Sequence, residues 1–113
     1  MPTRFTLTIP IKPKVKGRPR AGKHGFYTDK STREYEAAVE SAYIASGGPR
    51  FVGEVQVTAT FHKDHIDVTI IEATETSNLR GDLDNYVKAL LDGLNGAAFL
   101  DDSQVVNIKA FKR

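Results

Sequence analysis

The alternation of apolar and polar residues along the chain predicts four β-strands and two α-helices. A period of two residues is typical of a half-buried strand, and recurrence every three or four residues is typical of an amphipathic helix. The strand pattern occurs at 4–9, 54–62, 65–71 and 104–111, and the helix pattern at 32–46 and 82–95. The order of elements is therefore strand, helix, strand, strand, helix, strand.

This order predicts an α+β fold in two layers. Two helices on one face of a mainly antiparallel or mixed sheet of about four strands is an economical way to bury the apolar faces. We expect Phe5, Leu7 and Ile9 to face inward from the first strand, and the two middle strands to form a hairpin that turns at Lys63 and Asp64. Without internal repeats, the 113 residues are expected to form a single domain over 1–113.

Local signals place the ends of both helices. Ser31 and Glu34 match a capping box, in which Ser31 is the N-cap of the first helix. Gly47-Gly48-Pro49 is expected to end that helix, because glycine favours a helix C-terminus and proline cannot continue a helix. Gly96 suits the position just after the second helix.

Positive charge is concentrated near the N-terminus. Residues 1–35 carry nine Lys or Arg against two Asp or Glu, whereas the rest of the chain carries seven against twelve. Segment 10–29 is also rich in Pro and Gly, so it predicts a long basic loop that contacts a polyanion. A solvated loop that binds nothing is the alternative.

Composition excludes several classes of protein. The chain has no cysteine, which excludes disulfides, thiol nucleophiles and cysteine zinc sites. No apolar run approaches the ~20 residues that span a bilayer, and no signal-peptide core is present, so we expect a cytoplasmic protein without membrane contact. The three histidines, His24, His62 and His65, lack zinc-site spacing and are expected at the surface.

Acidic residues cluster around the second predicted helix. Asp82 and Asp84 lie at its start, Lys88 follows one turn later, and Asp101-Asp102 comes after the helix. Two carboxylates ~4 Å apart at an effective dielectric of ~20 repel by roughly 4 kcal/mol. If these acids lie close together, we therefore expect a cation to bind between them. Mg²⁺ binds through carboxylates and substrate phosphates, and Lys88 could orient a water or neutralise a phosphate.

Structural roles are also possible for each of these residues. Asp82 or Asp84 could be an ordinary N-cap. Lys88 could pair with Asp84 or Asp92 at a spacing of four residues, a contact worth ~0.3–0.5 kcal/mol. The pair at 101–102 could form a turn. Spacing alone leaves these alternatives open.

The sequence also resembles a known family. The segment Arg-Gly-Asp-Leu-Asp-Asn-Tyr-Val-Lys at 80–88, with its continuation to 95, and Phe-Leu-Asp-Asp-Ser-Gln-Val-Val at 99–106 resemble the RusA Holliday junction resolvases. The basic segment 16–20 and the segment 26–35 are similar to that family's front half. The resemblance implies a homodimeric, Mg²⁺-dependent endonuclease of phage or prophage type, with Mn²⁺ as a substitute, that cuts four-way DNA junctions in recombination and repair.

The resemblance also implies roles for particular residues. The family's metal-binding aspartates fall on Asp82, Asp84 and Asp102, and its catalytic lysine falls on Lys88, so these four form the implied catalytic set. Asp101 is the less favoured neighbour of Asp102, and the choice between them is open.

Contacts with branched DNA are expected from the basic loop and from one further arginine. The residues expected to contact DNA are Lys14, Lys16, Arg18, Arg20, Lys23 and Arg80. Two paired nicks in a symmetric junction suit a two-fold homodimer. The alternatives are a nuclease for other branched DNA, such as flaps or forks, and a nucleic-acid-binding module that does not cleave.

Overall fold

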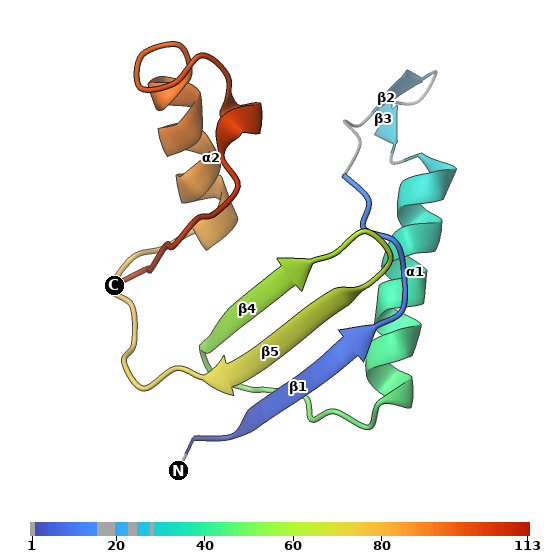
Figure 1. The fold of residues 1–113 in the computed structure, drawn as a ribbon. Helices are drawn as coiled ribbons and strands as arrows, with labels where there is room; N and C mark the ends of the chain where they lie inside the picture. The colour runs from blue at the N-terminus through green and yellow to red at the C-terminus, as the bar shows by residue number, and fades with distance from the viewer. Residues whose placement is uncertain (1, 16–19, 23–24, 28) are drawn as a thin grey trace. The chain divides into compact units, whose positions relative to one another are not determined.

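The computed structural model describes residues 2–15, 20–22, 25–27 and 29–113 (Figure 1). Its strands are β1 (Arg4–Ile9), β2 (Arg20–Gly22), β3 (Gly25–Tyr27), β4 (Val55–Phe61) and β5 (Ile66–Glu72). Its helices are α1 (Lys30–Ala45), α2 (Leu83–Leu94) and a 3₁₀-helix, η1 (Asp102–Gln104). The chain divides into unit 1, Met1–Thr74, and unit 2, Glu75–Arg113, and each is described by itself.

Unit 1 contains a three-stranded antiparallel sheet in the order β1-β5-β4 (Figure 1). The central strand β5 places Val68 opposite Leu7 on one side and opposite Ala59 on the other. Strands β4 and β5 form the predicted hairpin, which the bond from the His62 amide to the His65 carbonyl closes at 2.9 Å. A separate two-stranded ribbon pairs β2 with β3 inside the basic segment.

The core of unit 1 lies between this sheet and α1. Leu7, Ile9 and Ile66 are buried, and apolar side chains of α1, among them Tyr35 and Val39, pack against them. The inward-facing residues predicted for the first strand are confirmed, because side chains alternate between the two faces of a strand. Helix and sheet therefore make two layers in this unit.

Glycine is required where the chain leaves α1. A Cβ atom at Gly48 would lie 2.7 Å from ring atoms of both Phe5 and Tyr43, which is closer than real contacts allow. Those two rings pack edge to face with centroids 5.7 Å apart. The Tyr43 hydroxyl also donates to the Pro49 carbonyl, so this close approach fixes the end of the helix against the sheet.

The predicted N-cap of α1 was wrong by two residues. Asp29, not Ser31, caps the helix: its carboxylate accepts from the Thr32 amide at 2.7 Å and from the Ser31 hydroxyl at 2.8 Å. These hydrogen bonds, the Thr32 amide first, lower the pKa of Asp29 to about 2. A carboxylate accepts more strongly than a serine hydroxyl, so the helix begins at Lys30 and Ser31 becomes part of its first turn.

The strand predicted at 104–111 is absent from the described structure. Gln104 ends η1, and the described chain after it has no strand pairing. Val106, Ile108 and Phe111 favour a strand by their side chains, but 94%, 51% and 61% of their surface is exposed. β-propensity expresses packing against neighbouring strands, and the described part of unit 2 contains no named strand to pair with.

Helix α2 is the main element of unit 2 and matches its prediction within one residue at each end. Leu83, Val87, Leu91 and Leu94 are partly buried along one stripe, and Gly96 follows with a φ of 87°, as predicted for that position. The α+β class, with two helices and a mainly antiparallel sheet, is confirmed, although the main sheet has three strands and not four. Neither helix in the described ranges has the length and apolarity needed to cross a bilayer.

Candidate metal-binding site

The start of α2 is held by contacts around Arg80 and Gly81. Gly81 has a φ of 91°, a conformation that favours glycine, and its carbonyl accepts from the Lys112 ammonium at 3.0 Å. The Tyr86 hydroxyl donates to the Arg80 carbonyl. These contacts tie the turn before the helix both to α2 and to the end of the chain, and so fix the backbone that carries Asp82.

Asp82 and Asp84 occupy the first turn of α2 without acting as side-chain caps. Asp82 is the N-cap residue by position, but its side chain makes no capping hydrogen bond. Its carbonyl accepts from the Asn85 amide at 3.1 Å, so the helix begins on backbone bonds. Both carboxylates are exposed near the positive end of the helix dipole, which favours anions there. Their oxygens are available to a ligand.

Lys88 lies one turn after Asp84 and is exposed. Among described residues it forms no ion pair within 4.0 Å with Asp84 or Asp92. By contrast, Lys30 and Glu34 in α1 form an ion pair at this spacing, at 3.8 Å. The ammonium of Lys88 is therefore not held in a helix-surface salt bridge.

Asp101 and Asp102, adjacent in sequence, have different structural roles. The carboxylate of Asp101 accepts from the Ser103 amide at 3.1 Å, and Gln104 Oε1 accepts in return from the Asp101 amide at 3.0 Å. This capping box starts η1, and the hydrogen bonds from Ser103 lower the pKa of Asp101. Asp102, in the first turn of η1, has no such bond among the described residues. The Asp101 carboxylate is thus engaged in a capping hydrogen bond, and the Asp102 carboxylate is not engaged by a described residue.

The acids implied as metal ligands are not drawn together as a coordinating trio. Within the described ranges, the one group of three side chains whose ligand atoms all lie within 4.8 Å of one another is His62, His65 and Asp67. Asp82, Asp84 and Asp102 do not form such a group.

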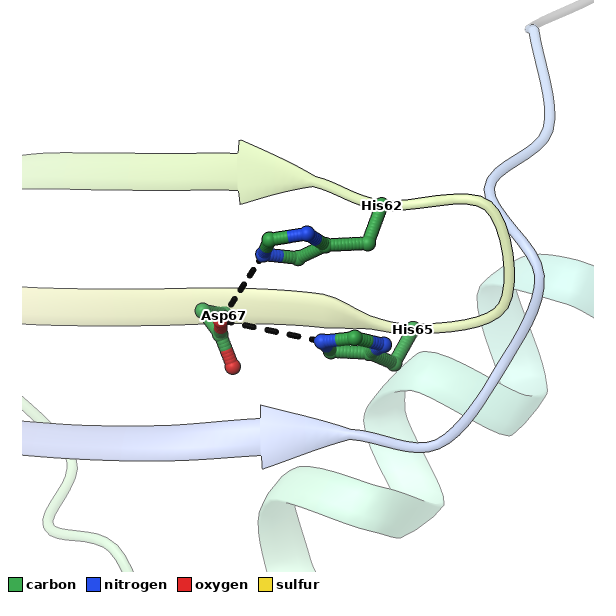
Figure 2. A group of neighbouring side chains, drawn as sticks. All are labelled: His62, His65 and Asp67. Carbon is green, nitrogen blue, oxygen red and sulfur yellow. Dashed lines mark hydrogen bonds and ion pairs between the residues drawn. The ribbon is translucent and has the colours of Figure 1, made fainter.

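The histidine group lies at the β4–β5 turn of unit 1 (Figure 2). The sequence predicted His62 and His65 as surface residues and not as metal ligands, and the structure brings them together with Asp67. The sequence pattern that could have indicated this group is His-x-x-His-x-Asp at 62–67, around a two-residue hairpin loop. Antiparallel pairing puts the two histidines opposite each other and Asp67 two residues along on the same face.

Only part of the set expected to contact DNA lies in the described structure. Lys14 and Arg80 are exposed. Arg20 begins β2, where only the backbone is described. Lys16, Arg18 and Lys23 lie outside the described residues, so their expected contacts stay predictions.

Comparison with known proteins identifies the family. The family model for endodeoxyribonuclease RusA matches residues 10–113. The chain belongs to the RusA family. The match includes α2, η1 and the basic segment, and it confirms the resemblance seen in the motifs at 80–88 and 99–106. By family the chain is an endodeoxyribonuclease, a hydrolase of DNA phosphodiester bonds, of the Holliday junction resolvase type. Neither the search of curated proteins nor that of solved structures gave a match.

Proposed function

We propose that this RusA-family chain is a Mg²⁺-dependent endonuclease that resolves four-way DNA junctions by paired symmetric nicks in recombination and repair. The observation that carries the proposal is the family match, which extends over 104 of the 113 residues, from 10 to 113. The free carboxylates around α2 and the basic segment near the N-terminus support it.

The donor set fits a hard divalent cation. Asp82, Asp84 and Asp102 offer carboxylate oxygens that no described residue engages, whereas the neighbouring Asp101 is engaged as a cap. Mg²⁺ takes oxygen ligands and completes its shell with water and substrate phosphates, and Mn²⁺ accepts similar ligands. When bound, the metal supplies activation of water and neutralisation of phosphate charge.

Lys88 is proposed as the catalytic lysine. Its ammonium is exposed and unpaired among the described residues, one helical turn from Asp84. A free ammonium can donate to a phosphate oxygen or orient a water, and it holds a positive charge where negative charge develops. An ammonium already committed to Asp84 or Asp92 would have been a weaker candidate for this role.

The basic segment is proposed to contact the DNA backbone, with Arg80 acting near the acidic residues. The proposed contacts come from Lys14, Lys16, Arg18, Arg20, Lys23 and Arg80. Contacts of this kind position a protein on DNA without reading sequence. A two-fold homodimer would present two equivalent sites to the two strands that a junction resolvase must nick.

The test is cleavage of a labelled four-way junction in Mg²⁺. We expect paired nicks at symmetric positions with the wild type, and retained binding without cleavage with Asp84→Asn. Asp92→Asn is the matched control, because Asp92 is an exposed acid two turns further along the same helix, and it should cleave as the wild type does.

Other outcomes separate the alternatives. Faster cleavage of flaps or forks than of the junction would assign the same chemistry to other branched DNA. Junction binding without cleavage in Mg²⁺ or Mn²⁺ would indicate a binding module and overturn the proposal. Equal cleavage by the wild type and Asp84→Asn would remove Asp84 from the catalytic set.

A further inference from the structure

The turn between β4 and β5 holds two histidines in a fixed relation. The His62 amide donates to the His65 carbonyl at 2.9 Å, so the two residues flank a two-residue loop at Lys63 and Asp64. Their rings stack with centroids 4.1 Å apart and planes 11° from parallel. The backbone therefore sets the separation of the two imidazoles.

Asp67 completes the group from the same face of the sheet. Its Oδ2 lies 3.0 Å from His62 Nε2 and 3.8 Å from His65 Nε2, so both Nε2 atoms are directed toward one carboxylate oxygen (Figure 2). The other oxygen, Oδ1, accepts from the Thr8 hydroxyl at 2.8 Å. Thr8 lies opposite Asp67 on β1, and this bond orients the carboxylate with Oδ2 toward the histidines.

These separations suit a small divalent transition-metal ion. Zinc–nitrogen and zinc–oxygen bonds of about 2.0–2.2 Å in a tetrahedron put neighbouring ligand atoms about 3.3–3.6 Å apart. The two measured separations from Asp67 Oδ2, 3.0 Å and 3.8 Å, lie on either side of that range. Movements of a few tenths of an ångström would bring these two separations into the range. Because an imidazole coordinates a metal in the plane of its own ring, the two rings, which stack 11° from parallel, must also tilt toward each other so that both Nε2 atoms point at one ion.

An outer contact also has the pattern found at metal-binding histidines. His65 Nδ1 lies 2.7 Å from Asp64 Oδ1, which leaves Nε2 of the same ring toward Asp67. A carboxylate on the far nitrogen fixes the tautomer of a ligating histidine and makes it a stronger donor. The three side chains are 36–46% exposed, so an ion can reach them from solvent.

We propose that His62 Nε2, His65 Nε2 and Asp67 Oδ2 form a binding site for a borderline divalent transition-metal ion, with Zn²⁺ as the expected occupant. Two imidazoles favour zinc over Mg²⁺, which prefers an all-oxygen shell. Three protein ligands leave a fourth tetrahedral position for water or another small ligand. The site is distinct from the acids around α2 and does not depend on the proposed nuclease activity.

Zinc binding to the untagged full chain, without DNA, tests this site. Titration calorimetry with zinc chloride should show a zinc equivalent that His65→Gln and Asp67→Asn each weaken by at least ~100-fold, more than the loss of an outer contact. Asp64→Asn, which changes only the outer contact, should weaken it by about 10-fold or somewhat more. Asn at position 67 keeps an acceptor for Thr8, so circular dichroism of these variants should match that of the wild type.

Two controls separate this site from other zinc-binding residues. His24→Gln removes the third histidine, and Asp84→Asn changes the acids around α2; both should bind zinc within twofold of the wild type. Loss of the zinc equivalent in either variant, with binding retained in His65→Gln, would overturn the assignment. So would a wild-type titration indistinguishable from that of His62→Gln/His65→Gln, which would leave a hydrogen-bonded cluster without a metal.

Histidine side-chain ¹H–¹⁵N spectra give a second measurement that does not depend on affinity. One equivalent of zinc should shift Nε2 of His62 and His65 as ligands and keep a proton on Nδ1 of His65, toward Asp64. Excess Mg²⁺ should leave these shifts unchanged. Zinc shifts confined to His24, or full displacement by Mg²⁺, would contradict the site.

Discussion

The aspartates of the two units differ in what their side chains contact. In unit 1, Asp29 caps α1, while Asp64 and Asp67 bond to histidines and to Thr8. The pKa of each is lowered, mainly by the Thr32 amide at Asp29, by His65 at Asp64 and by Thr8 at Asp67. In unit 2, Asp82 and Asp84 have no comparable partner among the described residues.

This difference separates Asp29, which serves the fold, from Asp82 and Asp84, whose carboxylates are free for a ligand. Asp67 does both, because its Oδ1 is bonded to Thr8 and its Oδ2 belongs to the proposed zinc site. Asp101 and Asp102 show the difference within a single turn, because the first is bonded to Ser103 and the second has no side-chain bond to a described residue. The two units also differ in how many of their residues are buried. Unit 1 has the buried core around Leu7 and Ile66, whereas neither α2 nor η1 contains a buried residue. The implied catalytic acids thus lie on a thinly packed part of the chain.

The largest expected effect is the contrast between Asp102→Asn and Asp101→Asn. Loss of a carboxylate ligand should lower the Mg²⁺-dependent junction cleavage rate by at least ~100-fold in Asp102→Asn, since changes merely adjacent to metal ligands already cost 10–100-fold. Asp101→Asn keeps an oxygen that can accept from Ser103, so its cleavage rate should stay within a few-fold of the wild type. Single-turnover cleavage of a pre-bound junction measures both.

The reverse order, with Asp101→Asn inactive and Asp102→Asn active, would show that the capping residue is the ligand. The contrast between bonded and unbonded aspartates would then not identify catalytic acids. Melting temperatures of both variants, measured without metal, show whether a loss of activity comes from unfolding.

The next effect is that of Lys88→Met, which should reduce the cleavage rate of bound junction by roughly 10²-fold, as expected for loss of one group that stabilises developing charge. Junction affinity should change little, because one cation contributes only a small part of a multi-phosphate contact. Lys109→Met is the matched control, since Lys109 is an exposed lysine of the same unit. An equal loss of activity in both variants would point to general electrostatics and not to a catalytic lysine.

A smaller effect is expected from the basic segment of unit 1. If about six phosphates are neutralised, the plot of log affinity against log salt should have a slope near −5, and Lys14→Ala should reduce its magnitude by about 1. Lys63→Ala, at an exposed lysine of the hairpin loop, should leave the slope unchanged. Fluorescence anisotropy with a labelled junction in Ca²⁺, which avoids cleavage, measures the slope. A wild-type slope near zero would remove the segment from the binding model.

Much of the fold was readable from the sequence because local periodicity determined it. The strand at 4–9, the hairpin and both helices each carry a local apolar period that predicts the element, although β1 pairs with the distant strand β5. The strand expected at 104–111 failed because β-branched residues such as Val105 and Val106 favour pairing but do not supply a partner. The cap of α1 was misplaced because Asp29, two residues before Ser31, offers a charged acceptor to the Thr32 amide, and a charged acceptor forms the stronger bond.

The two candidate metal sites were readable to different degrees. A sequence motif pointed to the acids around α2. A sequence does not show which carboxylates accept hydrogen bonds from backbone amides, however. The structure was needed to show that Asp101 accepts such a bond and Asp102 does not. The group at His62, His65 and Asp67 was missed for a different reason. Its members become neighbours only when a two-residue turn and antiparallel pairing place them on one face, so helical or zinc-finger spacing does not reveal them.

The smallest expected effect compares the N-cap residues of the two helices. Asp29 has a pKa of about 2 in the folded chain, below its ordinary 3.8. A depressed folded pKa means that its contribution to stability is fully present above the unfolded value and is lost as pH falls from about 4 toward 2. The difference in melting temperature between wild type and Asp29→Asn should therefore be a few degrees at pH 7 and shrink toward zero as the pH falls through about 2. Asp82→Asn, whose side chain caps nothing, should keep or raise the melting temperature at pH 7. Calorimetric melts of both variants across this pH range, without metal, measure the difference; an equal loss of stability in Asp82→Asn would make Asp82 a structural cap and end its contrast with Asp29.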